Sequence, residues 1–361
     1  MKILTFGEIM GRIAPAGFLR FAQSLPGNVT ITFAGAEANV AMSLAMFGAE
    51  AAFATVLPKH AIADACVASL RAAGIDVSRI IRSDTGRLGM YYLETGANQR
   101  PSNVIYDRTG SSIAVTPPDE YDWPSILTGS SWFHVTGITP SLSREAAEAA
   151  ITAAATARKL GLTVSTDLNF RKKLWNWEPT TTPRDLAEKT MRRLLASVDI
   201  VIANESDCED VLGIKGTDAE KGEIDNVRYS EVAREVVRQF PQVKKVTVTL
   251  RESVSASHNN WGGMLYDAVQ DRVFFAPLDA EGRYRPYEIR AIVDRVGTGD
   301  SFGAALIFAL TTPGLDAPDQ AVRFAAAASC LAHSIIGDFN FVSRREVESL
   351  MAGNVGGRVQ R

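Results

Sequence analysis

The stretch D-R-V-G-T-G-D-S-F-G-A-A-L, residues 294–306, sets two glycines around a threonine, then an aspartate, then helix-forming residues. Gly297 and Gly299 allow backbone conformations with positive φ and leave their N–H groups accessible. The first N–H groups of the helix that follows have no partner inside it, and the helix dipole adds partial positive charge at that end. The stretch therefore predicts a backbone site for an anion.

Asp300 stands at the same point, where its carboxylate can accept a proton from a hydroxyl held beside the anion. Backbone donors that stabilise a moving phosphoryl group, together with a base for the nucleophile, suit phosphoryl transfer. The alternative is structural, because an acid at this position can simply cap the helix or occupy its first turn. A short glycine motif taken alone favours that alternative.

Short apolar segments alternate with helical patterns along most of the chain, which is typical of β-α-β units and a mostly parallel sheet. The predicted strands cover residues 3–9, 30–35, 51–57, 131–137, 162–168, 199–203 and 243–250, and the predicted helices cover 36–47, 61–73, 144–160, 184–197, 205–212 and 229–239. We therefore expect an α/β fold whose sheet is flanked by helices.

Two segments interrupt this alternation. Residues 87–107 form the pattern of a β-hairpin, and residues 10–33 show no helical pattern, so the two could pair as a small β-layer over the sheet. Residues 214–228 are charged and contain several glycines, which predicts a surface insertion. The stretch 353–361 is expected to be a mobile tail.

Composition excludes several classes of protein. The chain has 361 residues, 46% of them hydrophobic, and a net charge of −3, so a full core can form and nucleic acid is not an expected partner. Cys66, Cys208 and Cys330 lie far apart, which argues against a disulfide framework or zinc site and fits a reducing cytoplasm. The first residues do not resemble a signal peptide, and no apolar run suits a membrane span.

A second motif lies near the start of the chain, in F-A-G-A-E-A-N-V-A-M-S-L-A-M-F-G, residues 33–48. Gly35 lets a ligand approach the backbone closely, and the side-chain amide of Asn39 can hold the hydroxyls of a polyol. The alternative is an ordinary strand-to-helix turn with a capping asparagine.

These two motifs, in this order and separation, resemble the pfkB (ribokinase-like) family of carbohydrate kinases. The resemblance covers nearly the whole chain and implies one kinase domain over residues 1–361. It implies a ribokinase-like, Rossmann-type core and a small β-sheet lid formed by about 10–33 and 87–108. ATP would bind near the motif at 297–300, which comes second along the chain, and the sugar between core and lid.

The family pattern assigns roles to the motif at 297–300. Asp300 would be the catalytic base, and the anion hole would consist of Gly297, Thr298 and Gly299, whose glycines also contact the nucleotide. Two positions depart from the usual D-T-x-G-A-G-D, since Arg295 replaces threonine and Thr298 replaces alanine. Arg295 could contact a nucleotide phosphate or face solvent.

Within the family, G-A-E-A-N-V-A is most similar to 2-keto-3-deoxygluconate kinases. In those kinases, lid positions similar to Tyr91, Tyr106 and Arg108 hold the acid sugar. Arg171 follows a strand in D-L-N-F-R, at the sheet edge where ligands bind in such folds. A guanidinium pairs well with a substrate carboxylate. The alternatives are lid packing for the tyrosines and solvated surface charge for the arginines.

The metal shell and the rest of the nucleotide site are less well matched. The family's N-x-x-E element corresponds to A-N-E-S-D-C-E, so Asn204 aligns and Asp207 takes the glutamate position, with Glu209 as a substitute. The resemblance implies Mg²⁺ there, whereas the same residues could simply cap a helix. Asn204 and Arg251 are further candidates for nucleotide contacts, and residues 328–337 fall where the family often encloses adenine.

The sequence thus predicts a cytoplasmic kinase that uses ATP and Mg²⁺ to phosphorylate the 6-hydroxyl of 2-keto-3-deoxygluconate. One alternative is a kinase of neutral sugars, such as a fructokinase or ribokinase, and another is a non-catalytic sugar or nucleotide sensor. A nicotinamide oxidoreductase is disfavoured because no G-x-G-x-x-G follows the first strand. Family lids often double as dimer interfaces, so the resemblance also implies a homo-oligomer.

Overall fold

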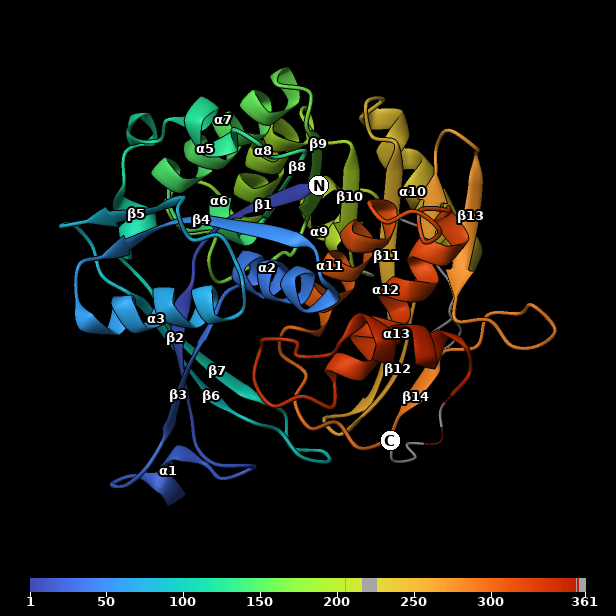
Figure 1. Cartoon of the computed structure of the whole chain (residues 1–361), viewed down its shortest axis with the longest axis horizontal. Helices are drawn as coiled ribbons and strands as arrows, with labels where there is room; N and C mark the ends of the chain where they lie inside the picture. The colour runs from blue at the N-terminus through green and yellow to red at the C-terminus, as the bar shows by residue number, and fades with distance from the viewer. Residues whose placement is uncertain (205, 216–225, 355, 357–361) are drawn as a thin grey trace.

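The computed structural model describes residues 1–204, 206–215, 226–354 and 356 (Figure 1). Its core is a ten-stranded sheet in the order β13-β12-β11-β10-β9-β8-β1-β4-β5, with β14 beside β12. The strands are β1 Lys2–Phe6, β4 Glu50–Pro58, β5 Ile80–Ser83, β8 Trp132–Thr136, β9 Thr163–Asp167, β10 Ile200–Ala203, β11 Lys245–Ser255, β12 His258–Asp267, β13 Arg272–Ala276 and β14 Tyr287–Ile289. From β11 to β5 all neighbours pair in parallel, which confirms the predicted sheet.

Helices cover both faces of this sheet (Figure 1). One layer contains α5 Trp123–Leu127, α7 Arg144–Lys159, α8 Pro183–Leu195, α9 Asp207–Leu212 and α10 Asn226–Gln239. The other contains α2 Ala36–Phe47, α3 Ala61–Ala72, α11 Thr298–Leu310, α12 Pro318–Ala332 and α13 Arg344–Met351. The expected α/β fold, with its sheet flanked by helices, is therefore confirmed. Among the described residues, no helix is long and apolar enough to cross a membrane.

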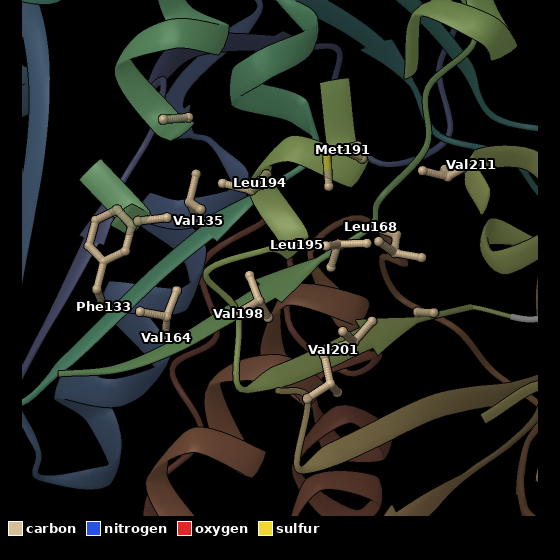
Figure 2. Close-up of a cluster of buried hydrophobic side chains, with 14 of the residues drawn as sticks. Phe133, Val135, Val164, Leu168, Met191, Leu194, Leu195, Val198, Val201 and Val211 are labelled. Atoms are coloured by element: carbon tan, nitrogen blue, oxygen red, sulfur yellow. The ribbon is translucent and has the colours of Figure 1, made fainter. Parts of the chain in front are cut away.

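The core under α8 shows how the central strands are buried. Met191 and Leu194 of α8 belong to the same cluster as Phe133 of β8, Val164 of β9 and Val201 of β10, and all of these side chains are fully buried (Figure 2). Because helices cover both faces, even polar residues of the central strands are buried, as Ser165 and Thr166 of β9 show.

A separate four-stranded sheet has the order β3-β2-β6-β7. Its strands are β2 Met10–Ala14, β3 Thr30–Ala34, β6 Gly89–Glu94 and β7 Asn103–Asp107, the last two forming the predicted hairpin. The short helix α1, Phe21–Ser24, lies between β2 and β3, so the expectation that residues 10–33 contain no helix is wrong. In Figure 1 this sheet extends away from the core, with α1 at its far end.

Several predicted boundaries are also wrong, three of them for clear reasons. The first strand ends at Phe6 instead of residue 9, because the chain leaves the core sheet at Gly7, where a Cβ would meet Glu37 Oε2 at 2.0 Å. The strand predicted at 243–250 continues to Ser255, since β12 folds back on it as an antiparallel partner. Residues 328–332 belong to α12, so only the second half of the predicted adenine loop is non-helical.

Most of the predicted insertion at 214–228 and of the predicted tail at 353–361 lies outside the described residues. Of the insertion, residues 226–228 belong to α10.

Candidate active site

A cavity of about 430 Å³ lies where the carboxyl ends of the parallel strands, the N-termini of α2 and α11 and the small sheet meet. It is lined by these residues predicted from the sequence: Gly35, Asn39, Tyr91, Tyr106, Arg108, Arg171, Asn204, Asp207, Arg251, Gly297, Thr298, Gly299 and Asp300. Glu209, the suggested substitute for Asp207, lines a separate small pocket instead. Residues from both ends of the chain thus share one cavity, as their proposed roles require.

The two glycines of the anion-hole turn serve different purposes. Gly297 caps α11 with φ +83°, and a Cβ there would lie 2.3 Å from the carbonyl oxygen of Asp338, so only glycine fits. A Cβ at Gly299 would meet no atom of the described chain within 4 Å. Packing therefore does not require glycine at 299, and the open space beside it leaves room for a ligand close to the helix N-terminus.

Asp300 lies in the first turn of α11, with its Oδ2 accepting a 2.7 Å hydrogen bond from Asn39 Nδ2. The Asn39 Oδ1 accepts from the backbone N–H of Gly35 at 3.3 Å, which fixes the orientation of the amide. Burial raises the pKa of Asp300 to about 6, and the hydrogen bond from Asn39 opposes this rise. Asp300 is thus suited to accept a proton near neutral pH. Sequence reasoning did not foresee that Asn39 holds this carboxylate.

The start of α2 is held by Glu37, another residue that the sequence reasoning missed. Its Oε1 accepts from the N–H and the hydroxyl of Thr136 and from the hydroxyl of Thr139, each at 2.8 Å. Burial raises the pKa of Glu37 to about 7. These bonds fasten α2 to the end of β8, and they thereby place Asn39 opposite Asp300.

Acidic side chains also line the cavity at the end of β9 and the start of α9. Burial, and then the charges of Asp207 and Asp300, raise the pKa of Asp167 well above its usual value. Arg171 is exposed and opposes this rise, while its Nη1 donates to the carbonyl of Phe170 at 3.0 Å. Asp167 was missed, although it opens the D-L-N-F-R stretch that indicated Arg171.

Asn204 and Asp207 form a capping arrangement at α9. Asn204 Oδ1 accepts from the backbone N–H groups of Ser206 and Asp207, at 2.9 and 3.1 Å. The Asp207 carboxylate accepts from the N–H groups of Asn204 and Phe170, at 3.0 and 3.2 Å. The capping alternative is therefore realised, and both residues still line the cavity. The described residues contain no group of three acidic, histidine or cysteine side chains placed to hold a metal ion.

The small sheet supplies Tyr91, Tyr106 and Arg108. Arg108 forms a buried ion pair with Glu8, and its guanidinium lies 5.5 Å from the centre of the Tyr106 ring. The charge of Arg108 is therefore already compensated within the protein, and the alternative of a solvated surface charge is wrong for this buried residue. Tyr91 donates its hydroxyl to Asp338 Oδ1 at 2.6 Å.

Arg12 of β2 connects the small sheet to the anion-hole turn. Its Nη2 lies 2.5 Å from Asp294 Oδ2 and its Nη1 lies 2.6 Å from Asp338 Oδ1, and all three side chains are buried. Asp294 opens the motif that continues to Asp300, and Asp338 packs against Gly297. One arginine of the small sheet therefore braces both sides of this turn.

Known proteins share this architecture and sequence. Residues 1–252 match the pfkB family of carbohydrate kinases. The chain is 30% identical over 356 residues to 2-dehydro-3-deoxygalactonokinase of Haloferax volcanii, covering 99% of this chain and 98% of that protein. The crystal structure of 2-dehydro-3-deoxygluconokinase of Thermotoga maritima is similar, with a TM-score of 0.87, 42% identity and coverage of 98% and 100%. A 2-dehydro-3-deoxygluconokinase of Thermoproteus tenax is 26% identical over 325 residues, 88% of this chain and 85% of that protein. Matches of this length confirm the predicted resemblance, and the chain belongs to the pfkB family of carbohydrate kinases.

Proposed function

We propose that this protein transfers the γ-phosphoryl group of ATP to the 6-hydroxyl of 2-keto-3-deoxygluconate, also called 2-dehydro-3-deoxygluconate. The observation that carries the proposal is the shared cavity. It holds the carboxylate of Asp300 beside the open N-terminus of α11, with Arg171 on another wall. Two kinases that resemble this chain over most of its length are named for this same compound.

In the proposed reaction, Asp300 accepts the proton of the 6-hydroxyl as that oxygen attacks the γ-phosphorus. The bond from the γ-phosphorus to the bridging oxygen breaks, and ADP leaves. The backbone N–H groups at 297–300 stabilise the charge that develops on the transferred group. With a pKa of about 6, Asp300 is mostly ionised at pH 7 and is ready to act as the base.

The choice of a sugar acid rests on the basic side chains. Arg171 is exposed at the cavity among Asp167, Asp207 and Asp300, and it can pair with a substrate carboxylate. Arg108 already pairs with Glu8, so it would contact the sugar as an oriented hydrogen-bond donor. Its buried Nε has no acceptor among the described residues, so this donor is not used within the described chain.

The residues present fit a magnesium ion held mainly by nucleotide phosphates and water. Asp167 and Asp207 both line the cavity, and the charge of Asp207 raises the pKa of Asp167. A divalent cation near them would relieve this repulsion between carboxylates. Both oxygens of Asp207 accept backbone N–H groups, so with Asn204 it would act through bound water. Mg²⁺ would supply charge neutralisation on the phosphates.

The three cysteines are free, which supports a cytoplasmic location.

The test is a coupled assay of ADP release by purified protein. The substrates are 2-keto-3-deoxygluconate, its C4 epimer 2-keto-3-deoxygalactonate, fructose and ribose. We expect turnover of a keto-deoxy acid and little of the neutral sugars. The epimer is included because one relative is a 2-dehydro-3-deoxygalactonokinase. Preference for fructose or ribose would establish the neutral-sugar alternative, and binding of sugar and ATP without ADP release would establish a sensor.

Arg171→Gln tests the carboxylate contact, with Lys172→Gln as the matched control. Lys172 is the exposed neighbouring cation and does not line the cavity. Loss of a charge-assisted pair predicts a KM for the sugar acid about 10- to 100-fold higher in Arg171→Gln and unchanged in the control. An equal loss for acidic and neutral sugars would contradict the contact.

A further inference from the structure

A basic cluster on the β11–β12 side of the cavity is not explained by the sugar site. Arg295 and Arg251 line this wall together with Trp261. Arg295 Nη2 donates to Asn259 Oδ1 at 2.6 Å and lies 3.5 Å from the carbonyl oxygen of Ser255, and both acceptors are uncharged. The buried Nε of Arg295 and the buried Nε1 of Trp261 find no acceptor in the described part of the chain. The wall therefore contains two buried N–H donors without an acceptor among the described residues.

A chain of hydrogen bonds fixes the orientation of Arg295. The carbonyl of Ser329 can only accept, so the proton in its 2.8 Å bond with His333 lies on Nδ1. Burial lowers the pKa of His333 to about 4, so the ring is neutral at pH 7 and its Nε2 is an acceptor. Asn259 Nδ2 lies 3.5 Å from that Nε2, which turns Asn259 Oδ1 toward Arg295.

Ser329 of α12 also supports the anion-hole turn. Ser329 donates its hydroxyl to the carbonyl of Thr298 at 2.6 Å. Ser329 thus supports both the guanidinium of Arg295, through His333 and Asn259, and the N-terminus of α11. This arrangement places the basic cluster and the anion hole in a fixed relation to each other.

The electrostatics of the wall favour an anionic ligand. Burial, and then the charge of Arg251, lower the pKa of Arg295, which means that the two guanidiniums repel each other. A polyanion between them would remove this repulsion. Arg171 follows β9, and β10 separates β9 from β11 in the sheet. The carboxylate of a sugar held at Arg171 is therefore not the anion that this wall would bind.

We propose that Arg295 binds the polyphosphate tail of the nucleotide, with the indole N–H of Trp261 as a second donor on the same wall. This assignment rests on the proposed function, because it takes the phosphoryl donor to be a nucleoside triphosphate. It explains why an arginine is held two residues before Gly297, with its guanidinium oriented by neutral partners. A carboxylate partner would compete with the phosphates, whereas Asn259 orients the cation and leaves its charge for the ligand.

The test compares adenosine, AMP, ADP and ATP by calorimetry on wild type, Arg295→Gln and the matched control Arg290→Gln. Arg290 is exposed and pairs with Glu288. We expect Arg295→Gln to weaken ATP binding about 10- to 100-fold and to leave adenosine binding unchanged, since only the phosphates meet the guanidinium. The control should match wild type, and Arg295→Lys should restore part of the loss because it keeps the charge.

Equal weakening of adenosine and ATP would overturn the proposal in favour of a structural role. Weakened binding of the sugar acid with normal ATP binding would overturn it as well. If wild type has no kinase activity, the proposed function fails, and titration with inorganic tripolyphosphate still tests this inference. Loss of that binding in Arg295→Gln supports the inference, and unchanged binding refutes it.

If Arg295→Gln does not fold, Asn259→Ala is the second variant, because it keeps the charge of Arg295 but no longer orients its guanidinium. It should weaken ATP about 3- to 10-fold relative to adenosine, and equal effects on both would again refute the proposal.

Discussion

Replacing Asn39 by alanine separates its two proposed roles, orienting the catalytic base and binding the sugar. The 2.7 Å bond from Asn39 Nδ2 to Asp300 Oδ2 stabilises the ionised carboxylate. Hydrogen bonds to charged groups contribute about 1.5–3 kcal/mol, and one pKa unit corresponds to about 1.4 kcal/mol. Losing this bond should therefore raise the pKa of Asp300 from about 6 to about 7–8.

The direction of the pH effect follows from the role of Asp300 as a base. Only the ionised form accepts a proton, so activity falls as the pH drops through the pKa. At pH 7 the ionised fraction should fall from about nine-tenths in wild type to between about one-half and one-tenth in Asn39→Ala. We expect kcat at pH 7 to drop about 2- to 10-fold and to approach the wild-type value near pH 9.

The assay is the coupled ADP-release measurement from pH 5 to 9.5 with saturating ATP and sugar acid. Ser43→Ala is the matched control, because Ser43 is buried one turn further along α2 and donates to the carbonyl of Asn39 without contacting Asp300. A shifted acidic limb in Asn39→Ala alone supports the orienting role. If kcat falls by the same factor at every pH, or if only the KM for sugar rises, Asn39 does not set the pKa of the base.

Three further predictions concern the same turn. Asp300 has a pKa of about 6 in the folded protein, compared with 3.8 for a free side chain. Its ionised form therefore destabilises the folded state above pH 6, and this cost disappears as the pH falls toward 4. Asp300→Asn should therefore raise the free energy of unfolding by up to about 3 kcal/mol at pH 8 but not near pH 4. Denaturant unfolding at both pH values measures this, and equal gains at both would contradict the burial argument. Gly299→Ala should leave the midpoint of thermal unfolding unchanged or raise it slightly, because alanine favours a helix and its Cβ would meet no atom within 4 Å. The same change should weaken ATP binding, and normal ATP binding would show that the ligand does not use the open space. Arg12→Met should lower the stability by about 3–5 kcal/mol, because it leaves Asp294 and Asp338 buried without their cation; a change below 1 kcal/mol would count against this.

The sequence predicts the parallel core well because its signals are local. Apolar strands, alanine-rich helices and the glycines at 297 and 299 indicate their own structure within a few residues. The boundaries at residues 6 and 255 failed because distant contacts set them. Gly7 packs against Glu37, and β12 returns to extend β11. No local pattern reveals either contact.

The site shows the same division. Local motifs and the family resemblance together indicated many of the residues that line the cavity, but they missed Asp167 and Asp338. The partners that determine their chemistry came from elsewhere in the chain. Glu8 neutralises Arg108, and Asn39 contacts Asp300 across 261 positions. A resemblance can transfer a residue's position, whereas its charge state depends on neighbours that only the fold brings together.

Arg12 fastens the small sheet to the anion-hole turn more firmly than a freely hinged lid would require. Its ion pairs with Asp294 and Asp338 join β2 to both sides of the anion-hole turn, and Tyr91 of β6 donates to the same Asp338. Separating the sheet from the core at this point would leave buried carboxylates unpaired, at a cost of several kcal/mol. Movement of the small sheet is therefore expected at its far end, around α1 and the turns, while its base stays fixed to the anion-hole turn that ends at Asp300.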